Sequence, residues 1–563
     1  MFFFERLVGG RKYRVAAESV WDPRRQQPVS RQVLLGPADP APVADLSRTR
    51  TLGTRRVGDV GALGWIAEQL HVVRHLNEAL AAGPGGPGPS AGQLVLAVAV
   101  QRACAPGAKR ALAAFLAESV PRLSCVPAAQ FSGQAFYRLA TGVTDEQLER
   151  AQIAIAREAV GRFGLATDVL AFDSTNFDTH IATTTPGELA RRGHAKSKRR
   201  DLRVVGLGVL VSETGHVPLL HRTYPGNSSD QAVLASCLEG LGRLHATLDD
   251  ADGRPGQAQR TVVRDGGCWS EQLELDLDVA GYHSLISLPL SHSAAEQALA
   301  YAAGPGRMKP LRGRLREVRA ARLAARVGDL DRTLVVVESQ DLLRGQKRGI
   351  AVALRKAKAE LRKLSQRAEA GRLQRDALET RVQKVLAREH LAAFVVVTLS
   401  GTKTHPRLTW RVDPARRRVL ERTRLGRRVL CTDHQLWSTE RIVTAFRGQW
   451  NVEELFRRAK KGGLVPWGPS YQRADTSLRL HTFATVLGLT LVALARVALG
   501  TRQSARAMMT ELADIKATLA RTKTGEQGRR PTVMIPPELS AAQRKAVKTF
   551  ELARWMPALS STM

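Results

Sequence analysis

Alternating apolar and polar residues near the start of the chain predict a β-hairpin. Apolar side chains alternate with polar ones through residues 12–35, on both sides of Asp22. Apolar residues at helical spacing follow, and Thr144 begins a capping box with Gln147 before a helix that runs towards Phe163. Residues 1–165 are therefore expected to form a β-hairpin and a mainly helical domain.

Short apolar runs predict a sheet in the next part of the chain. A four-residue turn makes the second and third runs a hairpin, and a helix that begins near Ser229 follows them. The runs span residues 169–172, 204–211, 217–224, 261–263 and 282–288. This succession of a strand, a hairpin, a helix and further strands predicts a mixed α/β fold.

Residues 292–437 are expected to form an α+β insertion outside that sheet. Apolar residues at helical spacing between Arg344 and His390 predict a basic helical hairpin or coiled coil that turns near Gly371. Strand-like runs flank it at residues 333–339, 394–400 and 408–412. From Ser438 onward the pattern is helical again.

The charge balance of the sequence indicates the class of its binding partner. The 563 residues include 85 Lys and Arg against 52 Asp and Glu, a formal net charge of +33. Such an excess makes a compact chain repel itself, a cost that is best tolerated when a polyanion is the partner, so nucleic acid is the leading candidate. An arginine-rich or ribosome-bound protein from a GC-rich genome is the alternative. With 44% hydrophobic and 24% charged residues, the composition excludes a wholly disordered or fibrous chain.

Cysteine spacing and the longest apolar stretch bear on the compartment. The five cysteines show no metal-ligand spacing, which is typical of core thiols in a reducing compartment. Residues 482–495 are apolar but too few to span a bilayer, and they predict a buried helix instead. We therefore expect a cytoplasmic, nucleoid-associated protein without a membrane partner.

Two aspartates directly follow predicted strands. Asp173 comes after residues 169–172, and Asp265 comes after residues 261–264. Binding sites concentrate at such strand ends, although a single aspartate there is more often a turn former. Each aspartate alone is therefore a weak functional candidate.

A third acid, Glu453, interrupts the apolar stripe of the helix predicted for residues 438–461. Steps of three and four place it in line with Phe446 and Trp450. A buried carboxylate needs a cation, a hydrogen-bond network or a metal ion as its partner, and an ion pair with Arg457 explains Glu453 equally well. Three converging carboxylates without His or Cys would suit Mg²⁺ or Mn²⁺, and two such ions support in-line phosphoryl transfer. With the basic charge, this predicts phosphodiester chemistry on DNA or RNA.

Three blocks of the sequence resemble the bacterial DDE insertion-sequence transposases of the IS-four superfamily, in particular its branch with a long helical insertion before the last acid. The family's signature is Tyr-x-x-Arg-x-x-x-Glu-x-x-x-x-x-x-Lys, and Glu453 and Lys460 match its last two residues. Phe446 and Gln449 stand where the family has Tyr and Arg, which removes two DNA-backbone contacts. The blocks are Ala171-Phe172-Asp173-Ser174-Thr175, Val262-Val263-Arg264-Asp265-Gly266-Gly267, and the segment from Phe446 to Lys460.

The resemblance implies an RNase H-like core in which the insertion precedes the helix that bears Glu453. It implies that Asp173, Asp265 and Glu453 are the catalytic residues and the ligands of two Mg²⁺ ions, with Mn²⁺ as a substitute. It further implies DNA contacts from the residues around the last acid: Arg447, Gln449, Trp450 and Lys460.

By the same resemblance the reaction is cut-and-paste transposition. The enzyme would bind the inverted-repeat ends of its insertion sequence, cut the DNA strands and transfer the freed ends to target DNA, as a homodimer in the paired-end complex. Two alternatives remain: a non-catalytic DNA-binding protein derived from a transposase, and a structure-specific nuclease with the same core.

Five parts of the chain are expected from these patterns. They are an N-terminal β-hairpin with a helical DNA-binding domain (1–165), the first part of the core (166–291), the α+β insertion (292–437), the second part of the core (438–500) and a C-terminal helical segment (501–563).

Overall fold

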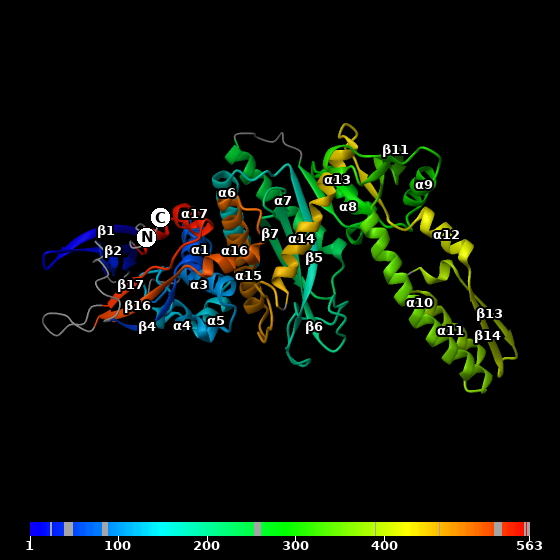
Figure 1. Ribbon diagram of the computed structural model, residues 1–563, viewed down its shortest axis with the longest axis horizontal. Coiled ribbons are helices and arrows are strands. Elements are labelled where there is room, and N and C mark those ends of the chain that lie inside the picture. The colour runs from blue at the N-terminus through cyan, green and yellow to red at the C-terminus, as the bar shows by residue number, and fades with distance from the viewer. Residues whose placement is uncertain are drawn as a thin grey trace. The chain divides into compact units, whose positions relative to one another are not determined.

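The computed structural model of the protein (Figure 1) describes residues 1–22, 25–38, 49–80, 88–252, 260–388, 390–460, 462–522, 532–556 and 559. The chain divides into two units. The first unit comprises Met1–Val262, Val279–Tyr282 and Gly448–Met563, and the second comprises Val263–Asp278 and His283–Arg447.

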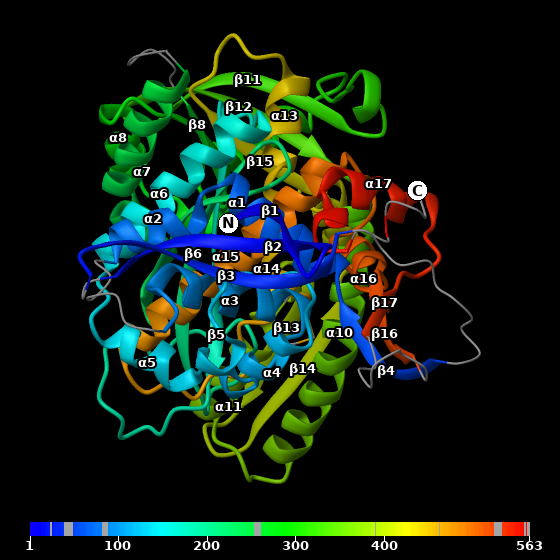
Figure 2. The same ribbon diagram turned by 90° about the vertical axis from the view of Figure 1, so that its left-hand side faces the viewer.

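Three antiparallel strands begin the first unit. They are β1 (Phe2–Val8), β2 (Arg11–Asp22) and β3 (Gln27–Pro37), in the order β1-β2-β3, and they lie side by side in Figure 2. The β2–β3 hairpin confirms the prediction for residues 12–35. The sequence does not predict β1, because its three consecutive phenylalanines lack the alternation of a half-buried strand. Pairing with β2 gives this segment its structure.

Helices follow this sheet in the first unit. The capping box at Thr144 is present, because the Gln147 N–H donates to Thr144 Oγ1 at 3.3 Å and the Thr144 N–H donates to Gln147 Oε1 at 2.9 Å. The predicted helix towards Phe163 is therefore confirmed. The helices are α1 (Gly58–Gln69), α2 (Val72–Ala79), α3 (Ala91–Cys104), α4 (Leu112–Ala117), α5 (Gly133–Thr141) and α6 (Asp145–Phe163).

The central apolar helix of the first unit is α15 (Asp475–Leu499), which packs against α1, α3 and α6. Residues 482–495 are all buried, which confirms the predicted buried helix. Among the described residues, α15 alone is long and apolar enough to cross a membrane. However, 83% of its apolar window is buried inside the protein, as in the core helix of a globular domain.

The first candidate acid, Asp173, lies in one of three antiparallel strands. They are β5 (Val169–Thr179), β6 (Arg203–Ser212) and β7 (Pro218–Pro225), and β6–β7 confirm the predicted hairpin. The expectation that Asp173 ends its strand is wrong, because β5 continues to Thr179. The backbone ladder with β6 extends from Leu170 to Thr179 and holds the polar half of β5 in the sheet. Helix α7 (Asp230–Asp252) packs against β5 and β7.

A nine-stranded sheet has the order β10-β11-β12-β15-β9-β8-β5-β6-β7. Its strand β8 (Thr261–Arg264) ends directly before Asp265, as predicted, and the boundary between the two units falls within β8. A mixed α/β fold with a large central sheet is consistent with the RNase H-like core expected from the sequence.

In the second unit, strands of the expected insertion belong to this sheet. Beyond β9 (His283–Leu288), the sheet continues with β15 (Arg427–Thr432), β12 (Leu330–Glu338), β11 (Arg319–Val327) and β10 (Lys309–Pro310), in that order. The expectation that residues 292–437 lie outside the sheet is therefore wrong for these strands. The reason is that β15, close to the end of the insertion, pairs antiparallel with both β9 and β12. Helices α8 (Glu271–Val279) and α9 (Ser293–Ala302) accompany them, and α9 covers β11 and β12.

The rest of the insertion has a core of its own. Helices α10 (Gln340–Glu369) and α11 (Arg375–Leu386) lie side by side as the predicted basic hairpin, with Gly371 at φ +67° between them (Figure 1). The strands β13 (Val395–Gly401) and β14 (Pro406–Val412) form a separate two-stranded sheet, followed by α12 (Pro414–Thr423). Buried residues of α10 recur at steps of three and four, which explains why the sequence pattern found this helix: Ile350, Ala353, Ala357, Leu361 and Leu364.

The C-terminal segment is not purely helical, contrary to expectation. Besides α16 (Ala505–Ala513) and α17 (Ala541–Thr549) it contains β16 (Lys516–Thr522) and β17 (Thr532–Ile535). These strands join β4 (Thr49–Arg56) in a three-stranded sheet of the order β17-β16-β4. Pairing between residues about 460 positions apart in sequence decides this structure, and no local pattern reports it.

Candidate active site

Within the first unit, β5 and helix α14 (Gln449–Ala459) bring two of the predicted acids to one place. Helix α14 packs against β5, which carries Asp173. Desolvation and the neighbouring Lys196 ammonium lower the pKa of Lys460, while the carboxylates of Asp173, Asp178 and Glu453 act in the opposite direction. Asp173 and Glu453 therefore share one ammonium neighbour, Lys460, as the signature match implies.

The Asp173 carboxylate is held by the backbone of its own strand. Its Oδ1 accepts a hydrogen bond from the Ser174 N–H at 2.7 Å. The Ser174 hydroxyl donates to Asp230 at the start of α7, and the Lys196 ammonium donates to the Ser174 carbonyl oxygen. One hydrogen bond therefore holds the Asp173 carboxylate directly, while the other two hold the neighbouring residue, Ser174.

A segment between β5 and β6 fixes Lys196 beside this carboxylate. Asn176 Nδ2 donates to the His194 carbonyl at 2.9 Å, and Asn176 Oδ1 accepts from the Lys196 N–H at 2.9 Å. The Ser197 hydroxyl donates to Asp178 at 2.8 Å. Alternate polar residues of β5 therefore anchor residues 194–197, and Lys196 is a second cation of the site that sequence reasoning missed.

The helix predicted for residues 438–461 is in fact two helices. Helix α13 (Thr439–Arg447) ends before Gly448, and α14 ends at Ala459, so Lys460 has an extended backbone with ψ 168°. The expectation that Glu453 and Lys460 lie on one continuous helix is wrong, although the two charges remain neighbours. A break at Gly448 costs little, because glycine is a poor helix former.

This break also changes the predicted apolar stripe. Trp450 is 60% exposed and Glu453 is exposed, so neither lies on a buried face. The alternative pairing of Glu453 with Arg457 is wrong too, because Arg457 pairs with Glu454 at 2.8 Å. The buried face of α14 consists of Val452, Leu455, Phe456 and Ala459.

The third acid, Asp265, belongs to the second unit and is exposed. It precedes a short 3-10 helix, and its carbonyl oxygen accepts from the Cys268 N–H at 3.0 Å. The next residue, Gly266, packs tightly, since a Cβ atom there would lie 2.7 Å from the Ser287 carbonyl oxygen. The turn that presents Asp265 therefore requires a glycine.

The other residues predicted to contact DNA differ in accessibility. Arg447, the last residue of α13, and Trp450 are exposed, and the Arg457 guanidinium lies 5.4 Å from the centre of the Trp450 ring. Gln449 is only 6% exposed, and its Nε2 has no hydrogen-bond partner among the described residues. A buried side chain cannot touch DNA in this conformation, so the structure does not support Gln449 as a direct contact.

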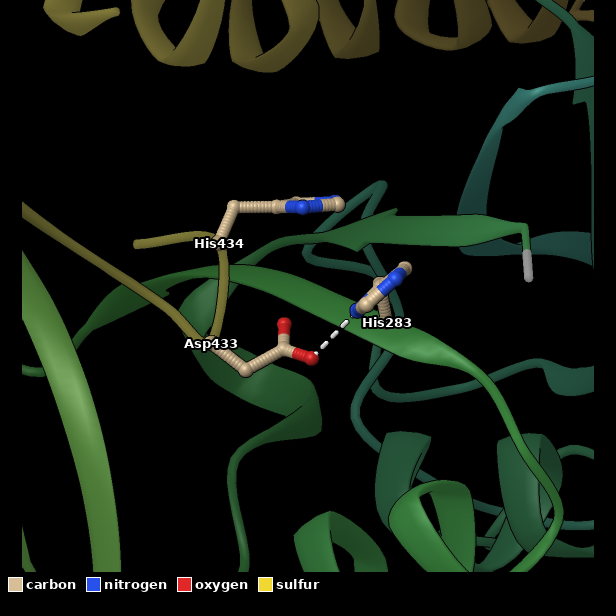
Figure 3. A group of neighbouring side chains, drawn as sticks. All are labelled: His283, Asp433 and His434. Carbon is tan, nitrogen blue, oxygen red and sulfur yellow. Dashed lines mark hydrogen bonds and ion pairs between the residues drawn. The ribbon is translucent and has the colours of Figure 1, made fainter. Parts of the chain in front are cut away.

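A histidine cluster in the second unit was missed by the sequence analysis (Figure 3). His283 Nδ1 lies 2.6 Å from Asp433 Oδ2, and the His283 and His434 ring centres are 4.1 Å apart. Burial, and next the His283 charge, lower the pKa of His434 to about 4. His283 and Asp433 are 150 residues apart and meet only because β9 pairs with β15, so no sequence spacing reports them.

Comparison with known proteins identifies the family. The family model described as the transposase DDE domain matches residues 164–465, which is more than half of the chain and includes all three predicted acids. A solved structure of the piggyBac transposase synaptic complex with hairpin DNA is 9% identical with a TM-score of 0.34, and the alignment covers 82% of this chain and 81% of that chain. No curated protein matches the chain. By the family match, the chain belongs to the transposases with a DDE domain.

Proposed function

We propose that this transposase binds the inverted-repeat ends of its insertion sequence and performs metal-dependent DNA cleavage and strand transfer, as a member of the IS-four superfamily branch with a long helical insertion. The observation that carries the proposal is the packing of α14, which bears Glu453 and ends directly before Lys460, against β5, which bears Asp173. The carboxylates of Asp173 and Glu453 both act to raise the pKa of Lys460, which supports a common site for the three residues.

The donor set fits divalent metal ions. Asp173, Asp265 and Glu453 all offer carboxylate oxygens, which are hard ligands suited to Mg²⁺ or Mn²⁺. In our proposal these three residues hold two ions. When bound, such ions activate the attacking oxygen and stabilise the leaving oxygen in an in-line phosphoryl transfer.

Two phosphoryl transfers account for the reaction. In the first, a water oxygen forms a bond to the phosphorus at the element's end, and the bond to the 3′ oxygen breaks, which leaves a 3′-hydroxyl and a 5′-phosphate. In the second, that 3′-hydroxyl loses its proton and bonds to a target phosphorus, while the target's own 3′ oxygen leaves. The number of phosphodiester bonds is unchanged in the second step, so no energy source is needed. In our proposal the ammonium groups of Lys460 and Lys196, which influence each other, neutralise phosphate charge during these steps.

DNA binding is proposed for other parts of the chain as well. The net charge of +33 suits a partner with a phosphate backbone. We place end recognition in residues 1–165 and mainly backbone contacts in the basic hairpin of α10 and α11. The active species is proposed to be a homodimer that pairs two ends, in the cytoplasm with the nucleoid.

The deciding experiment uses the DNA that brackets the protein's own reading frame. Linear DNA with one inverted repeat, with two matched repeats and with none should be incubated with the full chain and Mg²⁺. Cleavage and joining that require two matched ends support the proposal. Equal cleavage of one-ended DNA would favour a structure-specific nuclease, and binding without cleavage would favour a non-catalytic DNA-binding protein.

Lys460→Ala should lower the rate of strand cleavage by about tenfold to a hundredfold, because an ammonium next to Asp173 and Glu453 is lost where phosphate charge develops. The rate should be measured at saturating DNA and Mg²⁺. Lys516→Ala is the matched control, since Lys516 is an exposed lysine of the same unit whose acidic neighbour is Asp514. Equal rates for both variants would show that Lys460 is only part of the basic surface.

Trp450→Ala should weaken DNA binding by about fivefold to tenfold, because an exposed indole backed by Arg457 offers a stacking surface for a base. Fluorescence anisotropy with labelled end DNA would measure it. Trp450→Phe keeps an aromatic face and should retain most of the affinity. If Trp450→Ala binds as tightly as the unchanged protein, Trp450 is not a DNA contact.

A further inference from the structure

The histidine cluster has the ligand atoms of a metal site within a small volume. One ligand atom each from His283, Asp433 and His434 lies within 4.8 Å of the other two. Figure 3 shows both imidazole rings and the carboxylate beside one common space. Ligand atoms around a tetrahedral Zn²⁺ are roughly 3.3 Å apart at metal–ligand distances of about 2.0–2.1 Å. To bind an ion, the ligand atoms would therefore have to move closer together, and the His434 ring, whose centre is 4.1 Å from that of His283, would have to turn a nitrogen towards the ion.

Surrounding groups already orient these side chains. Asp433 Oδ1 accepts from the Ser284 N–H at 2.9 Å, which fixes the plane of the carboxylate. The His434 N–H donates to Thr432 Oγ1 at 3.2 Å, and the Trp437 ring stacks on the His434 ring at 3.7 Å. Such outer partners are what hold metal ligands in position in known metal sites.

The cluster is distinct from the site of Asp265, the predicted catalytic acid of the same unit. It lies at the first residue of β9, whereas Gly266, next to Asp265, packs against Ser287 near the last residue of that strand. At about 3.3 Å per residue, the two ends of this six-residue strand are roughly 17 Å apart. Asp265 is therefore too far away to be a ligand of an ion at the cluster.

The chemistry of the donors also differs. Two imidazoles and one carboxylate are ligands of intermediate softness, which suit Zn²⁺, while a site made only of carboxylates suits Mg²⁺. His283 and Asp433 are 27% and 17% exposed, so an ion and a water molecule as fourth ligand can reach them.

We propose that His283, Asp433 and His434 form a Zn²⁺ site with three protein ligands that is separate from the catalytic metal ions. It joins the start of β9 to residues 433–437, the segment that leads from β15 into α13. The ion would hold this connection in one conformation. The site does not depend on the proposed function, because its ligands take no part in the phosphoryl transfer.

The test is metal binding by the full chain after treatment with a chelator. Co²⁺ is the spectroscopic probe, since imidazole-ligated Co²⁺ of low coordination number absorbs visible light strongly, and Zn²⁺ is then titrated in competition. We expect one Co²⁺ per chain with this spectrum, displaced by Zn²⁺ but not by millimolar Mg²⁺. Zn²⁺ should also raise the temperature of thermal unfolding.

Variants assign the site. His283→Ala and Asp433→Asn should each lower Co²⁺ affinity by more than about 100-fold, which exceeds the usual loss for an outer partner. His405→Ala, an exposed histidine of the same unit, should leave affinity unchanged. Asp433→Asn preserves the size of the side chain, so it serves if His283→Ala does not fold. Absence of the Co²⁺ spectrum, or equal affinity in the ligand variants, would overturn the proposal and leave a hydrogen-bonded histidine–aspartate pair.

Discussion

Glu453→Gln should lower DNA strand cleavage by more than about 100-fold while end binding stays within about twofold. Removal of a residue that hydrogen-bonds to a metal ligand already lowers activity by about 10–100-fold, and removal of the ligand itself should lower activity further. The amide keeps the size of the side chain but removes the negative charge that a divalent ion needs. Because Glu453 is exposed, the change should not affect folding.

The neighbouring residue provides the control. Glu454 pairs with Arg457 at 2.8 Å and with Arg458 at 3.5 Å, on a different side of α14 from Glu453, so Glu454→Gln should cleave at a nearly normal rate. Asp173→Asn and Asp265→Asn should behave like Glu453→Gln. Cleavage rates would be measured at saturating Mg²⁺ on paired-end DNA. Normal cleavage by any of the three variants would exclude that residue from the catalytic set.

Arg264→Ala should destabilise the protein by about 3–5 kcal/mol, the usual cost of breaking a buried ion pair. The Arg264 side chain is fully buried, and its guanidinium donates to the Glu274 carboxylate and to Ser284 Oγ at 2.7 Å. Glu274 is also buried and lies 4.0 Å from Arg332. Removing Arg264 leaves the Glu274 carboxylate without its nearest charge partner inside the second unit. Chemical denaturation followed by circular dichroism would measure the loss.

An exposed ion pair is the matched control for Arg264. Arg316 and Glu317 are 84% and 88% exposed at a separation of 3.9 Å, so Arg316→Ala should change stability by less than about 0.5 kcal/mol. Similar shifts for both variants would mean that the buried pair contributes little. Because Arg264 directly precedes Asp265, the destabilised protein should also lose activity.

Local patterns in the sequence determined much of the secondary structure. The capping box at Thr144 starts a helix because the Thr and Gln side chains satisfy backbone N–H groups within four residues. Alternation over residues 12–35 made the first hairpin, and the apolar run at 482–495 became the buried helix of the first unit. The blocks around Asp173, Asp265 and Glu453 were sufficient to indicate the transposase family, which the family match confirms.

Only the tertiary structure decided the features that depend on distant pairing. Strand β5 continues past Asp173 because β6 supplies its ladder, the strands of the insertion enter the large sheet because β15 pairs with β9, and β4 pairs with β16. The His283–Asp433 contact has the same origin. Strand pairing is set by backbone hydrogen bonds between segments that any number of residues can separate, and a local pattern holds no information about them.

The surroundings of Glu453 depend on both the local sequence pattern and the tertiary packing. The sequence placed Glu453 and Lys460 at the family's spacing, but α14 begins only after Gly448 and ends at Ala459. In this helix Trp450 and Glu453 are exposed and Gln449 is buried, and Lys460 lies beyond its last residue. One helix face cannot be inferred across a glycine, because its continuation depends on what packs against it. The sequence by itself thus determined which residues match the family signature, while packing of α14 on β5 decided which of them are neighbours.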